Sequence, residues 1–578
     1  MKSKKQEKRK ATQQTVAEPA KPKRWPWALA AFVTIAVIFE VYEPALSGPF
    51  LFDDNYLPFR TPGFPVGSLM AWLQGVRPLL MFSYWVNYQL SGLDTFSYHV
   101  FNVLFHALNG MLIFLIARRI LEWAGVEQSR LDILAGFAGA LFLLHPAQSE
   151  SVGYVASRSE SLSVLFFFGA WAVFLYRRSA EVTWGRTAAV LSLFGAATVT
   201  KEHTAVLPAL LLLTDYFWNP GFSLKGIRRN WRLYGMIVVA AALAGLLVLN
   251  TLRGAPTAGF NIKEFTWYQY FFTQCRALWV YIRLFLFPAG QTIDYDFPIS
   301  RTVVDHGAIA GLVGLLLAAG AAFYYRRRYP LAAFGFFAYV ILMAPTSSFI
   351  PIQDPVAERR LYLSMIGLLF IALEFLRRWK AERTAMLAAL GGVLAGAAVL
   401  TYMRNHVWTS AVALWEDTVE KSPRKVRPQF QLAHAYFTLG ACDKAEVHYA
   451  IAAQLEPPDD SLLVDWGLAY DCLHKPDEAL AKLRQAAALH PNAHIYSQIG
   501  MVYGKQGKNA EALEALQTAV QLNPAFEMSY VYRGGVHLAM NDPATAEADF
   551  RQAMAINPQN QSARDGLSMA EARLRGKR

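Results

Sequence analysis

Long apolar stretches alternate with short polar ones over the first 400 or so residues, and this pattern stops after residue 402. Stretches of about 15 to 20 apolar residues recur between 27 and 402, and each is long enough to be a membrane helix. One soluble core does not need so many of them. The pattern therefore predicts an all-α chain with a polytopic membrane domain at 27–402 and a polar, soluble part at 403–578.

Short basic clusters divide the apolar stretches, and such clusters are retained on the cytoplasmic side of a membrane. They are Arg118-Arg119, Arg177-Arg178, Lys225 to Arg232, Arg326 to Arg328 and Arg377 to Lys380. Membrane helices fitted between them number eleven: 27–43, 97–117, 131–145, 161–176, 187–200, 204–217, 233–252, 307–325, 331–345, 361–376 and 385–402. An odd number of crossings places residue 403 onward outside the cytoplasm.

Two further apolar stretches, 78–90 and 268–288, do not fit as crossings. If either one spanned the membrane alone, the arginine pairs that follow it would lie on the outer side. We therefore expect both to lie in or near the outer interface as re-entrant or surface helices. If both cross instead, only the middle of the topology inverts and residue 403 onward stays outside the cytoplasm.

The charge of the chain is concentrated at its start. Lys and Arg number 55 against 43 Asp and Glu, a net charge of +12, and residues 1–24 hold nine basic and two acidic residues. That segment thus supplies +7 of the +12, which makes the charge a signal of membrane topology rather than of nucleic-acid binding. Residues 1–26 are expected to be a disordered cytoplasmic tail before a retained anchor.

The soluble part repeats with a period of 33 to 34 residues. The aligned registers are Tyr436, Tyr470, Tyr503 and His537; Ala445, Ala479, Ala512 and Ala546; Tyr449, Leu483, Leu516 and Phe550; Ala452, Ala486, Ala519 and Ala553; and Pro457, Pro491, Pro524 and Pro558. This pattern resembles the tetratricopeptide repeat (TPR), a helix pair in which alanines let the helices approach and proline ends the second one. We expect four repeats at 427–562, a half repeat at 403–426 and a capping helix at 563–578. Such an array serves either as a docking surface for a protein or peptide, or as a spacer or dimer contact.

The chain has three cysteines, Cys275, Cys442 and Cys472, which make neither a disulfide framework nor a metal motif. Cys442 and Cys472 would pair only if the soluble part lies in an oxidising compartment. The sequence favours unpaired cysteines.

Ionisable residues gather at the predicted outer face of the membrane domain. A charge near the centre of a bilayer costs at least ~2.5 kcal/mol, so such clusters commonly mark a site. The residues are Asp53, Asp54, His145, Glu150, Arg158, Glu160, Lys201, Glu202, His203, Asp294, Asp296, Glu358, Arg359 and Arg360. Their common side predicts one pocket that opens away from the cytoplasm.

The residue types suit group transfer from a lipid-linked phosphate. Asp53 or Asp54 would act as general base toward an acceptor hydroxyl or would hold a divalent cation, although adjacent acids also cap loops. Arg158, Lys201, Arg359 and Arg360 are candidates to neutralise the departing phosphate. We assign the neighbouring polar residues to the same donor site: Glu150, Glu202, His145, His203, Asp294, Tyr295, Glu358 and Tyr362.

Three polar residues, His99, Asn102 and His106, share one face of the second predicted helix. We favour a structural hydrogen-bond network over substrate contact, and place Arg77 with them as a supporting residue. No third metal ligand is evident beside the two histidines, and whether the protein holds a metal stays open.

Seven short motifs, in this order and followed by the repeats, resemble the transmembrane-and-TPR-repeat (TMTC-like) O-mannosyltransferase family and its bacterial relatives, within the GT-C superfamily of membrane glycosyltransferases. The motifs are FDDNY (52–56), RPL (77–79), HVFNVLFH (99–106), HPAQSESVGYVASRSESL (145–162), KEHTAVLP (201–208), FPAGQTIDYDFP (287–298) and AERRLYLSMIG (357–367). The resemblance implies inverting transfer of a sugar from a polyprenyl-phosphate donor to an acceptor outside the cytoplasm. It maps the acidic residue of the first outer loop that GT-C enzymes require onto Asp53 or Asp54.

The animal members of that family transfer mannose to proteins in the secretory pathway. The basic tail, the short array and the lack of eukaryotic targeting features favour a multi-pass protein of the bacterial inner membrane, with periplasmic repeats. The resemblance implies a lipid-linked sugar donor and a protein or peptide acceptor, but neither the sugar nor the acceptor follows from it.

Two other functions compete with an enzyme. A non-enzymatic scaffold with TPR repeats for envelope assembly would not need so many costly ions at the outer face. A transporter of lipid-linked saccharides would place ionisable residues at mid-membrane and on both sides. The clustering of charges at one face therefore favours the glycosyltransferase.

Overall fold

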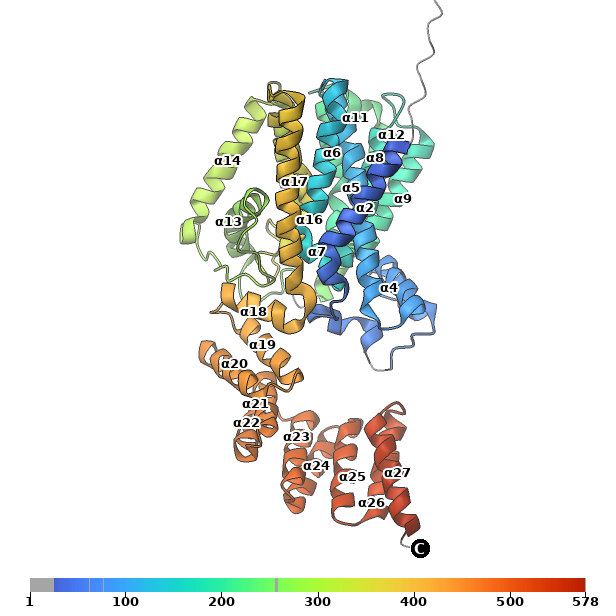
Figure 1. The fold of residues 1–578 in the computed structure, drawn as a ribbon, viewed down its shortest axis with the longest axis vertical. Coiled ribbons are helices and arrows are strands. Elements are labelled where there is room, and N and C mark those ends of the chain that lie inside the picture. Colours follow the sequence, from blue (N-terminus) through green and yellow to red (C-terminus); the bar gives the residue numbers. More distant parts are fainter. Residues whose placement is uncertain (1–24, 62, 76, 255–257, 577–578) are drawn as a thin grey trace, which may run out of the picture.

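The computed structural model describes residues 25–576 apart from 62, 76 and 255–257, and its described residues form helices and no named strand. Figure 1 shows two parts, a bundle of N-terminal helices above and a curved array of C-terminal helices below. The predicted all-α fold class is confirmed. The predicted basic tail lies, apart from its last two residues, outside the described residues.

The helices of the bundle coincide with the eleven predicted membrane helices. They are α2 (Trp25–Leu46), α5 (Thr95–Trp123), α6 (Gln128–Leu144), α8 (Arg158–Leu175), α9 (Trp184–Thr200), α10 (Leu207–Trp218), α12 (Trp231–Gly254), α14 (Ala308–Tyr324), α15 (Pro330–Met343), α16 (Leu361–Arg378) and α17 (Arg383–Asn405). Within the described part of the chain, five helices are long and apolar enough to cross a membrane, or six if α6 and the segment after it, bent by 54°, form one span. The protein is thus a membrane protein, and eleven crossings remain a prediction.

Close helix packing in the bundle depends on small residues. α15 and α16 meet at Gly335 and Gly367, where a Cβ on Gly335 would lie 2.4 Å from the Gly367 carbonyl oxygen. The aromatic rings of Trp171, Phe334 and Phe370 pack beside this contact with centroids 5.5 to 6.3 Å apart. Inside a bilayer such tight packing stabilises helix pairs, because lipid is as apolar as the side chains.

The two stretches that did not fit as crossings form α4 (Pro78–Ser91) and α13 (Trp267–Leu286). Figure 1 shows α4 beside the lower end of the bundle and α13 nearly end-on, across the direction of α14 and α17. The contacts agree with this arrangement of α13. The indole N–H of Trp279 donates to the Gly311 carbonyl of α14, and the Phe285 carbonyl oxygen lies 3.0 Å from Nε2 of His145, which follows α6. This arrangement fits interfacial helices, and their depth in a bilayer stays a prediction.

Shorter helices connect these elements. They are α3 (Leu69–Leu73), α7 (Ser149–Gly153), α11 (Lys225–Arg229), η1 (Phe52–Tyr56), η2 (Pro58–Arg60), η3 (Pro146–Gln148), η4 (Val155–Ser157), η5 (Glu202–Val206), η6 (Asp305–Gly307), η7 (Glu358–Arg360) and η8 (His406–Thr409). Figure 1 labels α7 in the half of the bundle toward the repeats and α11 at the opposite end.

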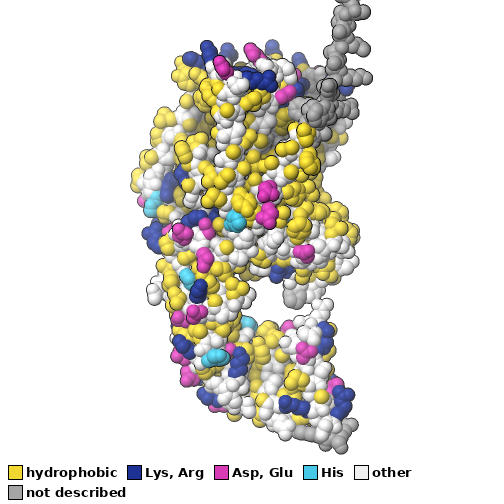
Figure 2. All heavy atoms as spheres, viewed as in Figure 1, with side chains coloured by type: hydrophobic (Ala, Val, Ile, Leu, Met, Phe, Trp, Pro, Cys, Tyr) yellow, Lys and Arg dark blue, Asp and Glu magenta, His cyan; other side chains and the backbone are white. Residues whose placement is uncertain are grey.

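Buried charges also occur at the opposite end of the bundle, which the sequence analysis did not predict. Asp215 is fully buried and pairs with Arg177 at 2.6 Å, and Glu374 is fully buried and pairs with Arg377 at 2.8 Å. Figure 2 shows Lys and Arg side chains gathered at that same end, with apolar side chains over the middle of the bundle. Each buried carboxylate lies beside an arginine of a basic cluster, so these pairs join helix ends and loops rather than form a pocket.

The C-terminal part consists of stacked helix pairs. After α18 (Ala411–Lys421) come α19 (Val426–Thr438) and α20 (Cys442–Leu455), α21 (Asp460–Cys472) and α22 (Pro476–Leu489), α23 (Ala493–Lys505) and α24 (Asn509–Leu522), α25 (Glu527–Ala539) and α26 (Pro543–Ile556), and finally α27 (Gln561–Gly576). The repeated alanines are buried, among them Ala445, Ala479, Ala512 and Ala546. These small side chains let each pair close, as the repeat pattern predicts.

Cys442 and Cys472 form a disulfide, contrary to the expectation of unpaired cysteines. Cys442 begins α20 and Cys472 ends α21, and their Cα atoms lie 6.2 Å apart. Stacking of the first two repeats brings these helix ends together, and a spacing of 30 residues along the chain does not reveal it. Cys275 is free and buried.

Candidate active site

The first outer loop carries the two adjacent aspartates in η1, and the structure separates their roles. Asp54 is buried, and its carboxylate accepts hydrogen bonds from the backbone N–H groups of Leu51 at 3.0 Å and Ala156 at 2.6 Å. Burial raises the pKa of the Asp54 carboxyl to about 8, against the opposing effect of those two N–H groups. Asp54 therefore anchors η1 to η4 and is enclosed by protein.

Asp53 is exposed, and no hydrogen bond or ion pair within the described part of the chain occupies its carboxylate. Its backbone N–H donates to the Tyr154 hydroxyl at 2.7 Å. The preceding residue, Phe52, has a φ of +46°, which is unusual for a residue other than glycine, and its ring packs edge-on against Trp415 at 5.4 Å. Helix α18, in the half repeat before the array, thus supports a strained loop that presents Asp53.

The Tyr154 hydroxyl accepts from the Asp53 N–H and is acted on by the charges of both aspartates and of Arg359. Burial raises the pKa of the Tyr154 hydroxyl well above its ordinary value, the charges of Asp54 and Asp53 raise it further, and the guanidinium of Arg359 lowers it. Asp53 and Arg359 are thus both within electrostatic reach of one hydroxyl. The sequence analysis did not single out Tyr154, although it stands inside the motif at 145–162.

Arg359 is the best-placed cation for an anionic ligand. Its backbone N–H and its Nη1 both donate to Glu150, at 2.9 and 2.5 Å. Burial lowers the pKa of Arg359, but the charge and hydrogen bond of Glu150, together with the charges of Asp354 and Tyr154, raise it above its ordinary value, so the guanidinium stays charged. The Arg359 side chain is 26% exposed, and Nε and Nη2 take part in none of the hydrogen bonds of the described residues. Two donors therefore remain for a phosphate.

Two more ion pairs extend this charged region along η5. Lys201 pairs with Glu160 at 2.5 Å, and His203 Nε2 lies 3.3 Å from the same carboxylate. Arg77 holds Glu202 through two parallel hydrogen bonds of 3.0 and 2.9 Å. The charge of Arg359 acts on both Glu160 and Lys201, so the pairs belong to one cluster. The structure thus brings together the carboxylates and cations that the sequence analysis drew from five separate motifs.

Arg158 lies elsewhere than the predicted phosphate site. It is completely buried and donates to Asn102 Oδ1 at 2.8 Å, Asn87 Oδ1 at 2.6 Å and the carbonyl oxygens of Ser83 and Tyr98. Its guanidinium also stacks over the Tyr84 ring at 4.5 Å. Because these groups surround it, Arg158 has no face left for a ligand. It holds α4, α5 and α8 together.

The polar face of α5 forms a hydrogen-bond network, as favoured from the sequence. His99 Nε2 lies 3.0 Å from the Gly48 carbonyl, Asn102 donates to the carbonyls of Val152 and Tyr154, and His106 Nδ1 lies 2.9 Å from the Tyr362 hydroxyl. Tyr362 is fully buried in this network, and thus does not lie in the open site to which the sequence assigned it. The network fixes the segment that carries Tyr154.

Glu358 and Tyr295, two of the remaining candidates, hold the segment that carries Arg359 in place. Glu358 is buried and accepts from Gln291 Nε2 at 2.6 Å, Thr292 N at 2.8 Å and Tyr295 OH at 2.8 Å. These bonds tie η7, which carries Arg359, to the loop after α13. Glu358 and Tyr295 are therefore positioning residues.

Arg360, His145 and Asp294 are also engaged within the protein. Arg360 donates to the backbone carbonyls of Asp354 and Pro355, and His145 caps η3 through the Ala147 N–H. Asp294 pairs with Lys425 and Arg427, and Arg427 also reaches Asp354 at 2.8 Å. Arg360 thus does not face a ligand as predicted. Lys425 and Arg427, which the sequence did not mark, lock the first repeat onto the outer loops.

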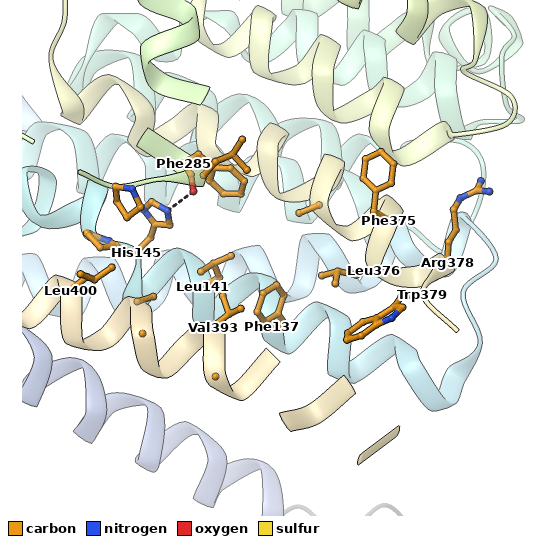
Figure 3. Close-up of a pocket in the computed structure, with 17 residues that line it drawn as sticks. Phe137, Leu141, His145, Phe285, Phe375, Leu376, Arg378, Trp379, Val393 and Leu400 are labelled. Carbon is orange, nitrogen blue, oxygen red and sulfur yellow. Dashed lines mark hydrogen bonds between the residues drawn. The ribbon is translucent and has the colours of Figure 1, made fainter. Parts of the chain in front are cut away.

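An apolar cavity of about 770 Å³ lies on the membrane-facing side between α6, α16 and α17. Figure 3 shows His145 with Phe285 near one end of it and Arg378 with Trp379 near the other, with Phe137, Leu141 and Val393 between. The end of the cavity at His145 and Pro146 adjoins the charged cluster. The Pro146 carbonyl accepts a hydrogen bond from Gln291, which also donates to Glu358, the residue before Arg359.

Among the described residues, no three His, Cys, Asp or Glu side chains are grouped so as to hold a metal ion. The divalent cation considered from the sequence therefore has no ligand set in the described part of the protein.

Comparison with known proteins finds sequence relatives that cover most of this chain. Residues 497–561 match the tetratricopeptide repeat family model. Mouse protein O-mannosyl-transferase TMTC3 is 23% identical over 544 residues, which cover 84% of this chain and 57% of the mouse protein. The Caenorhabditis elegans protein O-mannosyl-transferase F38B6.6 is 22% identical, with 74% of this chain and 63% of the worm protein covered.

A shorter match is closer in sequence. Drosophila melanogaster Protein O-mannosyl-transferase Tmtc1 is 31% identical over 196 residues, 30% of this chain and 21% of the fly protein. The crystal structure of YrrB, a TPR protein, covers 31% of this chain and 88% of its own at 18% identity, with a TM-score of 0.23. The chain spans less than two thirds of the length of each of these curated relatives. Over most of its length the chain is similar to the TMTC-like protein O-mannosyl-transferases, and its C-terminal part contains tetratricopeptide repeats.

Proposed function

We propose that this protein is a membrane glycosyltransferase that moves a sugar from a polyprenyl-phosphate donor to a protein hydroxyl outside the cytoplasm. The observation that carries the proposal is the exposed carboxylate of Asp53, a residue whose backbone N–H donates to the Tyr154 hydroxyl, together with the partly free guanidinium of Arg359, whose charge acts on the same tyrosine. A base on one side and a phosphate-binding cation on the other are what such a transfer requires. The names of the relatives make mannose the first sugar to test.

The proposed reaction inverts the configuration at the sugar carbon. The acceptor oxygen attacks C1 on the face opposite the phosphate, a C–O bond forms and the bond from C1 to the phosphate oxygen breaks. The hydroxyl proton passes to Asp53 as the bond forms. Arg359 stabilises the negative charge of the departing polyprenyl phosphate, and Lys201 adds a second cation in the same cluster.

The apolar cavity supports a lipid-linked donor. It lies along helices that we assign to the bilayer, and its polar end leads through Gln291 and Glu358 to the residue next to Arg359. A prenyl chain in this cavity would leave its phosphate near the guanidinium.

The distribution of charge and the disulfide support a periplasmic site in a bacterial inner membrane. Basic clusters gather at the end of the bundle away from the repeats, as expected for the cytoplasmic side (Figure 2). The Cys442–Cys472 bond lies in the repeats, and disulfides persist in oxidising compartments such as the periplasm. We assign the repeats to the docking of the acceptor or of a partner protein.

The test uses the full chain in membranes, a polyprenyl-phosphate mannose labelled in the sugar, and extracts of envelope proteins. Labelled protein should form with the wild-type chain, and Arg359→Ala should reduce transfer while leaving the chain folded. Glu478→Gln, an exposed substitution in α22 away from the site, is the matched control. If no labelled polyprenyl-phosphate sugar supports transfer, or if Arg359→Ala transfers as the wild type does, the proposal fails.

A further inference from the structure

A groove lies between the first outer loop, which carries Asp53, and the first repeats. It encloses about 820 Å³ between the first outer loop and helices α19, α21 and α23. Figure 2 shows an open hollow between the bundle and the curve of the repeats in this region. The groove is therefore built from both parts of the chain.

The loop side of the groove leads to Asp53. Phe52, Asn55 and Tyr56 line the groove, and they flank Asp53 within η1. Tyr56 is 79% exposed, and Leu439 on the repeat side is 72% exposed. Exposed large side chains that face each other across a groove are typical of a surface that a partner covers.

The repeat side of the groove is acidic. Asp460 and Asp465 line it, and no Lys or Arg is among the described residues of its lining. Their ion-pair partners, His490 at 3.2 Å and His434 at 3.4 Å, are charged only when protonated. An occupant with a Lys or Arg side chain would therefore be favoured over a neutral or acidic one.

We propose that this groove holds the acceptor polypeptide in an extended conformation, with a hydroxyl residue at Asp53 and a basic residue over Asp460 and Asp465. The inference rests on the proposed function for the role of Asp53. It adds a specificity that the transfer reaction does not itself require: the modified Ser or Thr has a Lys or Arg a few residues away along the chain. Aromatic contact with Tyr56 and Phe430 would hold the intervening residues.

Binding is tested apart from catalysis. A photoreactive phenylalanine analogue replaces Tyr56 in full-length protein that also carries Asp53→Asn, and cross-linking is measured with short synthetic peptides. The peptides contain one Thr and, a few residues away, Lys, Gln or Glu in otherwise identical sequences. The Lys peptide should cross-link at about tenfold lower concentration than the Gln peptide, and the Glu peptide should bind least.

Matched variants locate the charge effect. Asp460→Asn combined with Asp465→Asn should bring binding of the Lys peptide to the level of the Gln peptide, whereas Asp477→Asn, exposed on α22 outside the groove, should change nothing. Thermal unfolding of each variant checks that the array is folded. Equal cross-linking of the three peptides, or a Lys preference that survives the double variant, would overturn the inference.

The two proposals fail separately. If the Lys peptide cross-links as expected but no polyprenyl-phosphate sugar is transferred to it by the chain with Asp53 intact, the groove stands and the glycosyltransferase proposal fails. If sugar is transferred to envelope proteins equally by the wild type and the double variant, the enzyme stands and the groove proposal fails.

Discussion

The two adjacent aspartates of the first outer loop should respond differently to the same kind of substitution. Asp54→Ala removes the acceptor of two backbone N–H groups, the buried one of Leu51 and the partly buried one of Ala156. A buried donor without a partner costs about 1–3 kcal/mol and a partly buried one at most as much, so the loop should lose roughly 1–6 kcal/mol of stability. Asp53→Ala removes no hydrogen bond of the described residues, and its stability cost should stay within about 0.5 kcal/mol.

For sugar transfer the order should be the opposite of that for stability: substitution of Asp53 should reduce the rate without unfolding the chain. Loss of a general base reduces a rate roughly a hundredfold to ten-thousandfold, so Asp53→Asn should abolish most transfer at unchanged thermal stability. Asp54→Asn keeps one acceptor oxygen and should lie between the wild type and Asp54→Ala in stability. The measurements are thermal unfolding of the purified chain in detergent and transfer of labelled sugar in membranes at equal expression.

Two outcomes would refute this reasoning. A chain with Asp53→Asn that transfers at the wild-type rate cannot use Asp53 as its base. If instead Asp54→Ala unfolds at the same temperature as the wild type, the two backbone hydrogen bonds do not hold η1 to η4, and the separation of roles between the aspartates is wrong.

Three further predictions concern other contacts. Tyr154→Phe removes the acceptor of the Asp53 N–H and should slow transfer roughly fivefold, an effect of about 1 kcal/mol, with normal expression; Tyr98→Phe, at a hydroxyl that bonds only the Gly92 carbonyl outside the site, is the control. Replacing both Cys442 and Cys472 by Ser should destabilise the array by about 3–4 kcal/mol in the loop-entropy model, and unchanged unfolding would show that the stacked repeats need no bond. The hydrogen bond to Asp465 raises the pKa of His434, so this pair stabilises the array below pH 6.5 and the contribution is lost as pH rises through the raised value. The measurement is the difference in unfolding temperature between the wild type and His434→Gln, taken from below pH 6.5 to above the raised pKa. A difference that does not change with pH would contradict the prediction.

Local patterns predicted most of the fold. The bounds of α5, α6 and α16 lie within a few residues of the predicted helices, because apolar length and basic clusters are properties of the chain itself. The repeats were equally accessible, since the period of Ala and Pro reflects a packing that each helix pair makes with its neighbour. The charged residues of the outer face were found for the same reason: their cost in a bilayer makes them conspicuous.

The site itself was predicted in outline and not in its assignments. Arg158, Arg360 and Tyr362 were candidates for ligand contact, but all three are enclosed: Arg158 and Tyr362 by groups from helices far apart in sequence, and Arg360 mainly by carbonyls of the loop just before it. Conversely, Tyr154 was missed, because its role depends on a hydroxyl that meets the backbone of Asp53 about a hundred residues earlier. Residue type shows which side chains can bind a phosphate, whereas the partners of each side chain decide which ones are free to do so.

The sequence by itself determined the helices, the repeats and the residue types of the charged cluster. Tertiary structure decided that Asp54 is a buried anchor while Asp53 is open, that Cys442 meets Cys472, and that the first repeats form a groove with the first outer loop. The physical reason is the distance along the chain over which each interaction acts. Helix formation and membrane partition depend on neighbours within a few turns, but burial and pairing depend on which distant surfaces close against one another.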